Sequence, residues 1–380
     1  MSGTQRLHGL DFLRASMMLL GIVLHGAQMY MTMNVAFDYY RDPMSSPVMD
    51  GLLIFINTFR MPVFFFLSGF FTALLYQRYA IFGMLENRFK RIVLPFVILL
   101  PPLALVLSLQ WISASQLLAT GALGLDSSHV PYPHLLYNNT HHLWFLYYLM
   151  YILAGTVAVV WIWERLPSTF RSQLGQFFAG VDAGGPLVIG ALGITAGCMA
   201  LSTYFGRIGG GIVFAPYGMG IAFFALCFWA GWGLWYRQAS LATLERRCWH
   251  YLVIATAFFA IALAAFFTQG DRQSPLFSML HPVLALGNGL SVAFYVAGLT
   301  GLFSRYFSGY NPRIRYLSDS AYWVYILHQP ALLLFAVPMY HWVIPAQLKF
   351  LIACAGTALI CLWTYDLLVR NTGMGMLLNG

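Results

Sequence analysis

Ten apolar runs of about 18–26 residues follow one another along the chain, and each is long enough to cross a bilayer as a helix. The runs are Leu10–Met33, Gly51–Tyr76, Ile92–Ile112, Leu143–Trp163, Pro186–Tyr204, Pro216–Tyr236, Trp249–Thr268, Leu280–Phe303, Leu317–Val337 and Ile344–Leu367. Only 8% of the 380 residues are charged and 60% are hydrophobic, whereas soluble domains carry about 25% charged residues. The sequence therefore predicts an all-α, polytopic membrane protein in a lipid bilayer.

Lysine and arginine are divided unevenly between the segments that join these runs. Arg78, Arg165 and Arg237 are among many basic residues on one expected side of the membrane, whereas few, such as Arg41 and Arg272, fall on the other. Because basic loops stay on the cytoplasmic side, both termini are expected in the cytoplasm. This topology also explains the formal charge of +8, so no nucleic-acid partner is expected. Without long soluble segments or repeats, residues 1–380 are expected to form one transmembrane domain.

The cysteines and the longest outer segment add two further expectations. The five cysteines occur singly, without CxxC or Cys/His spacing, so neither a metal site nor a disulfide framework is predicted. The segment 113–142 has no lysine or arginine but contains four histidines. Its turn residues allow it to fold back as a short lid over the outer face.

Several ionisable side chains lie inside runs that must sit in lipid, where a charged group costs roughly 2.5–3.5 kcal/mol on insertion scales. Arg14 and His25 are eleven residues apart, which places them about 20° apart on one helix face. Asp11 precedes Arg14 by three residues and can pair with it. Arg60 lies at about the same depth as His25, and His328 lies near mid-depth in the ninth run. His25, Arg60 and His328 are therefore predicted to converge.

Two kinds of site follow from these positions. A buried histidine stays in the neutral form that accepts a proton, so the converging residues form a candidate catalytic centre. On the cytoplasmic side, Arg88 and Arg91 stand at spacing i, i+3 at the mouth of the third run. This spacing puts both guanidinium groups on one face, where they suit phosphate oxygens.

Simpler explanations exist for the individual residues. Arg88 and Arg91 fit the basic residues that flank membrane helices in the cytoplasm, and Arg14 fits a snorkelling residue paired with Asp11. His142 and its neighbouring histidine fit ordinary interfacial residues. The meeting of three ionisable residues at one depth nevertheless favours a functional site.

A basic cytoplasmic cluster joined to a buried histidine favours an anionic cofactor that enters from inside. Coenzyme A fits this layout, because its phosphates would stay at the arginines while its flexible arm carries an acyl thioester inward. An anion or proton-coupled transporter fits the same composition, although two matching halves with broken helices are not evident.

Several motifs resemble those of the acyltransferase-3 family of membrane acyltransferases. LDFLR, at residues 10–14, is followed by ten residues and His25, as in the first-helix signature of the family, and an Arg-x-x-Arg pattern falls on Arg88 and Arg91. Further similar stretches are FRMPVFFFLSGFF (59–71), QRY (77–79), RFKRIVLP (88–95), HLWFL (142–146) and YILHQP (325–330). The resemblance covers the whole chain and is strongest to members that succinylate osmoregulated periplasmic glucans.

The resemblance implies that a cytoplasmic acyl-CoA donates its acyl group to a hydroxyl of a periplasmic glucan. Succinyl-CoA is the favoured donor and acetyl-CoA the alternative; O-acetylation of another cell-envelope polysaccharide is the other activity within the family. His25 would be the general base, directly or through a relay. Arg14, Arg88 and Arg91 would hold the donor, and Arg60 would stabilise an oxyanion or hold a succinyl carboxylate.

The remaining candidates surround this centre. His328 would act in proton relay or acceptor positioning. The candidate substrate-binding residues are Asp11, Asn57, Ser68, His142, Trp144 and Tyr325. An acyl-enzyme carried by His25 or Ser68 is a minor route. The expected location is the bacterial cytoplasmic (inner) membrane, as a multi-pass protein, and a homodimer is compatible with the sequence.

Overall fold

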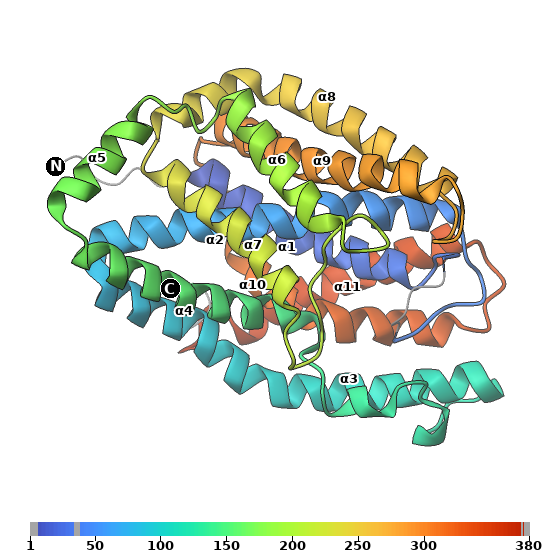
Figure 1. The fold of residues 1–380 in the computed structure, drawn as a ribbon. Helices are drawn as coiled ribbons and strands as arrows, with labels where there is room; N and C mark the ends of the chain where they lie inside the picture. The colour runs from blue at the N-terminus through green and yellow to red at the C-terminus, as the bar shows by residue number, and fades with distance from the viewer. Residues whose placement is uncertain (1–6, 34–38, 374, 376–380) are drawn as a thin grey trace.

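The computed structural model describes residues 7–33, 39–373 and 375, and the regular elements in these ranges are all helices (Figure 1). The α-helices are α1 (His8–Gln28), α2 (Pro47–Arg88), α3 (Leu94–Thr120), α4 (Trp144–Arg165), α5 (Ser168–Ala179), α6 (Pro186–Ala200), α7 (Gly218–Trp235), α8 (Ala239–Thr268), α9 (Phe277–Tyr306), α10 (Pro312–Ala336) and α11 (Ala346–Leu368). A π-helical turn, Phe89–Val93, joins α2 to α3, and short 3₁₀ segments lie at Ser127–His129, Pro133–Leu136, His141–Leu143 and Val337–Met339.

By length and composition, 8 stretches within the described ranges are long and apolar enough to cross a membrane. One of them, Pro47–Thr120, contains both α2 and α3, and the backbone at Ala80 breaks it with a φ of 52°. This stretch therefore carries two of the ten expected runs. The fifth run corresponds to α6, whose 15 residues reach only about 22 Å. The all-α polytopic class is confirmed, while the count of ten and the cytoplasmic termini stay predictions.

α1 occupies the middle of the bundle, where it packs against α2, α9, α10 and α11 (Figure 1). Its buried residues include Leu10, Leu13, Met17 and Leu24. A helix that is covered by protein on several sides is shielded from lipid. Ionisable residues on α1 can therefore lie at membrane depth without facing hydrocarbon.

Two glycines bring α2 and α7 into backbone contact. A Cβ at Gly69 would lie 1.8 Å from the carbonyl oxygen of Phe228, and a Cβ at Gly231 would lie 1.8 Å from that of Phe66. Small residues at such crossings let membrane helices approach closely. The crossing lies beside Ser68, whereas the kink in α2 occurs farther along, at Ala80.

Polar contacts hold the described residues on either side of positions 34–38, between α1 and α2, in place. The Asp50 carboxylate accepts hydrogen bonds from the backbone N–H groups of Thr32 and Met33, which follow the end of α1. Asp42 forms an ion pair with Lys349 of α11 at 2.8 Å, and both side chains are fully buried. This pair links the first outer segment to the last helix of the bundle.

The outer segment 113–142 folds back, as its turn residues suggested. α3 continues to Thr120 before the chain turns, and the Ser108 hydroxyl then donates to the Leu136 carbonyl oxygen at 3.1 Å. Farther on, the backbone N–H and the hydroxyl of Thr140 donate to the carbonyl oxygen of Ile212, at 2.6 and 2.7 Å. These bonds join the start of α4 to the loop between α6 and α7.

Candidate active site

Side chains from α2 and α10 meet against a glycine of α1 near the middle of the bundle. A Cβ at Gly21 would lie 2.8 Å from Arg60 Nη1 and 3.2 Å from His328 Nε2. Arg60 is 7% exposed and His328 is 1% exposed, so both are enclosed by protein. Gly21 thus leaves the space in which a cation and an imidazole lie together.

Three imidazoles then form a row, which we call the histidine row: His25, His328 and His142. His25 lies one helical turn beyond Gly21, and its ring centroid is 5.2 Å from that of His328. The His328 centroid is 4.9 Å from that of His142. The row therefore connects α1, α10 and the 3₁₀ turn before α4.

Hydrogen bonds assign the ring nitrogens of this row. A carbonyl oxygen only accepts, so His328 Nδ1 donates to the Tyr325 carbonyl oxygen at 2.7 Å, and His142 Nε2 donates to that of Ile326 at 3.0 Å. In neutral rings the other nitrogens, His328 Nε2 and His142 Nδ1, carry lone pairs, and neither has a hydrogen-bond partner in the described structure. His25 Nδ1 lies 3.2 Å from Gln28 Oε1, which also leaves Nε2 as the acceptor.

Tyr325 joins His328 to His142, because its carbonyl oxygen accepts from His328 Nδ1. Its hydroxyl donates to the His142 carbonyl oxygen at 2.7 Å, and its ring lies edge-on to that of His142. His141, the neighbour that sequence reasoning set aside, is 1% exposed and adopts a φ of 51°. Its Nδ1 bonds the Tyr39 hydroxyl at 2.5 Å. Burial excludes the interfacial interpretation for both histidines, and only the adjacency of the pair in the sequence hinted at this.

The second cluster, the arginine cluster, lies where α1 meets the junction of α2 and α3. Arg14 pairs with Asp11 at 3.2 Å, as the spacing predicts, and its guanidinium lies 5.3 Å from the centroid of Phe71. Arg88 immediately precedes the π-helical turn and Arg91 lies within it, and such turns are frequent at functional sites.

The arginine cluster holds more positive than negative charge. Arg14 and Arg91 lie close enough to Arg88 to repel it electrostatically. The buried Arg88 Nε and Nη2 have no hydrogen-bond partner within the described ranges. Asp11 is the acidic side chain that interacts with Arg91. Such a cluster is suited to bind the oxygens of an anion.

Three further candidate residues lie apart from both clusters. Asn57 lines a small cavity together with Arg207 and Asn288. Ser68 lies two turns beyond Arg60, about 12 Å along α2, beside the glycine crossing with α7. The Trp144 ring packs over Gly210 and stands edge-on to Tyr148.

The site thus combines a buried histidine row, which begins near the middle of α1, with an arginine cluster at the junction of α2 and α3. The chain belongs to the acyltransferase-3 family, because the family model for the acyltransferase domain matches residues 7–366.

Among curated proteins, the chain is similar to glucans biosynthesis protein C of Escherichia coli. The protein of strain K12 is 31% identical over 171 residues, and that of strain SMS-3-5 / SECEC is 30% identical over the same length. These alignments cover 44% of this chain and 42% of each relative, so the similarity to these relatives spans less than half of their length. No solved structure matches the chain.

Proposed function

We propose that the protein transfers an acyl group, preferably succinyl, from a cytoplasmic acyl-CoA to a hydroxyl of an extracytoplasmic glucan. The observation that carries this proposal is the histidine row, which connects the middle of α1 to the turn before α4 inside the protein. Membership of the acyltransferase-3 family supports the reaction class. The names of the relatives support a glucan as the acceptor.

The chemistry assigned to the row is general-base catalysis. His25 takes the proton of the acceptor hydroxyl, whose oxygen attacks the thioester carbonyl carbon. Arg60 stabilises the oxyanion that forms, since its guanidinium lies beside the row. The carbon–sulfur bond then breaks, the ester bond remains, and the thiolate of CoA takes the proton from His25.

His328 and His142 continue the row from His25, the proposed base, toward the expected extracytoplasmic end. Their unpartnered nitrogens are suited to relay a proton or to accept a hydrogen bond from the acceptor hydroxyl. Tyr325 keeps His142 in place through its bond to the His142 carbonyl oxygen.

The arginine cluster is the proposed site for the phosphates of the donor. Arg14 and His25 are separated by about 16.5 Å along α1, a gap that the flexible arm of CoA would span. Direct transfer is favoured over an acyl-enzyme on Ser68, because Ser68 is buried beside the α2–α7 crossing. A bacterial inner-membrane location and a possible homodimer belong to the same proposal.

The test uses purified protein with succinyl-CoA, acetyl-CoA and a periplasmic β-glucan. Thiol release and glucan mass are measured for the wild type, His25→Ala and the control His341→Ala, whose side chain is exposed. Glucan succinylation that only His25→Ala loses supports the proposal. Acetylation by wild type would keep the mechanism but replace the acyl group, and absence of CoA binding would refute the donor and favour a transporter.

A further inference from the structure

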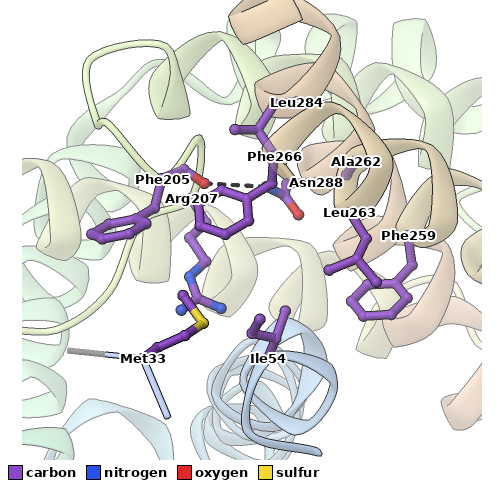
Figure 2. A pocket seen from close by; sticks show the side chains of 10 residues that line it. All are labelled: Met33, Ile54, Phe205, Arg207, Phe259, Ala262, Leu263, Phe266, Leu284 and Asn288. Atoms are coloured by element: carbon purple, nitrogen blue, oxygen red, sulfur yellow. Dashed lines mark hydrogen bonds between the residues drawn. The ribbon is translucent and has the colours of Figure 1, made fainter. Parts of the chain in front are cut away.

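Arg207 lies in the loop between α6 and α7, and its guanidinium reaches between α2, α8 and α9 (Figure 2). The loop lies at the same end of the bundle as the turn before α4, because the Ile212 carbonyl oxygen accepts hydrogen bonds from Thr140. Arg207 therefore stands at the expected extracytoplasmic end, opposite the arginine cluster.

The backbone around Arg207 is held firmly. The Thr203 hydroxyl accepts from the Arg207 N–H and donates to its carbonyl oxygen, both at 3.0 Å. Asn288 of α9 donates to the carbonyl oxygen of Gly206 at 2.9 Å, and Gly206 has a φ of 56°, which favours glycine. The position of the Arg207 backbone is thus set by the fold.

The guanidinium of Arg207 has no hydrogen bond or ion pair with the described residues. Apolar side chains, including those of Met33, Ile54 and Phe266, line one side of it (Figure 2). By contrast, the guanidinium carbon of Arg272, at the same end, lies over the ring of Tyr204, 6.0 Å from the ring centroid. A half-buried charge without a partner is unfavourable unless a ligand supplies the opposite charge.

Two cavities, each of about 30 Å³, adjoin Arg207. Each has room for a few ligand oxygens rather than for a whole sugar, since a water molecule needs about 10–15 Å³ by the same measure. The second cavity is lined by the side chains of Asn57, Thr58 and Asn288, and no acidic residue lines either one. The Asn288 amide donates to the carbonyl oxygens of Phe205 and Gly206, so Asn57 supplies the amide donor beside the guanidinium. An amide donor next to a guanidinium suits an anion that is attached to a polar molecule.

We propose that Arg207, with Asn57, forms a subsite for an anionic substituent, a carboxylate or phosphate, on the extracytoplasmic carbohydrate acceptor. This inference rests on the proposed function. Two connections link the subsite to the candidate active site. Asn57 lies one turn before Arg60 on α2, and the loop that carries Arg207 bonds to Thr140, two residues before His142.

Binding without acyl-CoA tests the subsite separately from catalysis. The probes are a neutral β-glucan oligosaccharide and the same oligosaccharide carrying one phosphate monoester, measured by calorimetry in nanodiscs. We expect the wild type to bind the phosphorylated probe about tenfold more tightly. Arg207→Gln should lose this preference, Arg207→Lys should keep part of it, and the control Arg272→Gln should keep all of it.

The outcomes separate this inference from the proposed function. Equal binding of both probes by wild type, or an unchanged preference in Arg207→Gln, would overturn the anionic subsite but leave a glucan acceptor in place. If neither probe binds to wild type, the glucan acceptor fails and the subsite fails with it. If Arg207→Gln loses only affinity for vesicles containing phosphatidylglycerol, the anion is a lipid headgroup and the inference is wrong. Thermal unfolding of each variant checks that the fold is intact.

Discussion

At the scale of single residues, the candidate active site depends on which ring nitrogen of each histidine stays available. The carbonyl oxygens of Tyr325 and Ile326 engage one nitrogen of His328 and of His142 and leave the other without a partner. Backbone acceptors on α10 thereby select the tautomers. His25 differs, because its partner is the side chain of Gln28 on its own helix.

Replacing His25 by alanine removes the proposed base and should lower kcat by about 10²–10⁴-fold. His25→Gln should be nearly as inactive, because an amide cannot accept the proton. Turnover of acyl-CoA with glucan measures both variants. Activity within threefold of wild type in either variant would move the base to another residue.

A methyl group at Gly21 should impair activity more than stability. The nearest atom to the new Cβ, Arg60 Nη1, is the end of a flexible side chain and can move away. We expect Gly21→Ala to melt within a few degrees of wild type but to lose most of its kcat, because Arg60 leaves the row. Gly155→Ala, in open space on α4, is the control. Full activity of Gly21→Ala would show that the position of Arg60 does not matter for the reaction.

Arg88 is the residue of the arginine cluster with the most unpaired buried donors. Arg88→Ala should weaken acyl-CoA binding about tenfold or more, since hydrogen bonds to charged groups are the strong ones. Calorimetric titration with acyl-CoA measures this effect. Arg165→Gln is the control, because that guanidinium stacks on Trp161 of its own helix. Equal affinities of the two variants would place the donor elsewhere.

At the scale of elements, the crossing of α2 and α7 has little room to adjust, because main-chain atoms are in contact there. The candidate active site differs, because Gly21 meets the end of the flexible Arg60 side chain. The atom that a Cβ at Gly69 would meet belongs to the main chain of Phe228, so the helices would have to separate. The π-helical turn between α2 and α3 interrupts the regular α-helical hydrogen-bond pattern, directly after Arg88 and at Arg91 itself.

We therefore expect Gly69→Ala to destabilise the protein by about 1–3 kcal/mol through overpacking. Gly233→Ala, on α7 with no atom near the new methyl group, should be neutral or slightly stabilising. Thermal unfolding in the same detergent compares the two variants. Equal melting temperatures would mean that the crossing can open without penalty.

At the scale of the whole molecule, an ion pair between Asp42 and Lys349 joins the beginning of the bundle to its last helix. The two residues are 307 positions apart in the chain. Tyr40 also donates to Asp42, and Gln347 bonds Ser46 nearby. The outer segment after α1 is thus fastened to α11. The backbone N–H groups of Asp42 and Ser46 also donate to the carbonyl oxygens of Met29 and Tyr30, just beyond the end of α1.

Lys349→Met should destabilise the protein by about 3–5 kcal/mol, because it leaves the Asp42 carboxylate buried without its cation. The double variant Asp42→Asn with Lys349→Met should recover part of this loss. Thermal unfolding of the single and double variants measures the coupling. An additive pair of effects would show that the two charges do not depend on each other.

The sequence by itself determined the helical membrane class, the family and the pairing of Asp11 with Arg14. Apolar runs of bilayer length and a spacing of three residues are local patterns, which a linear reading captures. It also pointed to His25, Arg60 and His328, because depth within a membrane can be counted from the end of a helix.

The tertiary structure decided what depth alone leaves open, namely which helices are neighbours. Only the packing of α10 against α1 brings His328 to Gly21. Likewise, only tertiary contacts place His141 against Tyr39 and His142 against α10. The same packing leaves Asn57 facing Arg207 rather than the histidine row. The physical reason is that neighbours in a membrane bundle are selected by close van der Waals fit, which depends on both surfaces at once, as in the glycine contacts between α2 and α7.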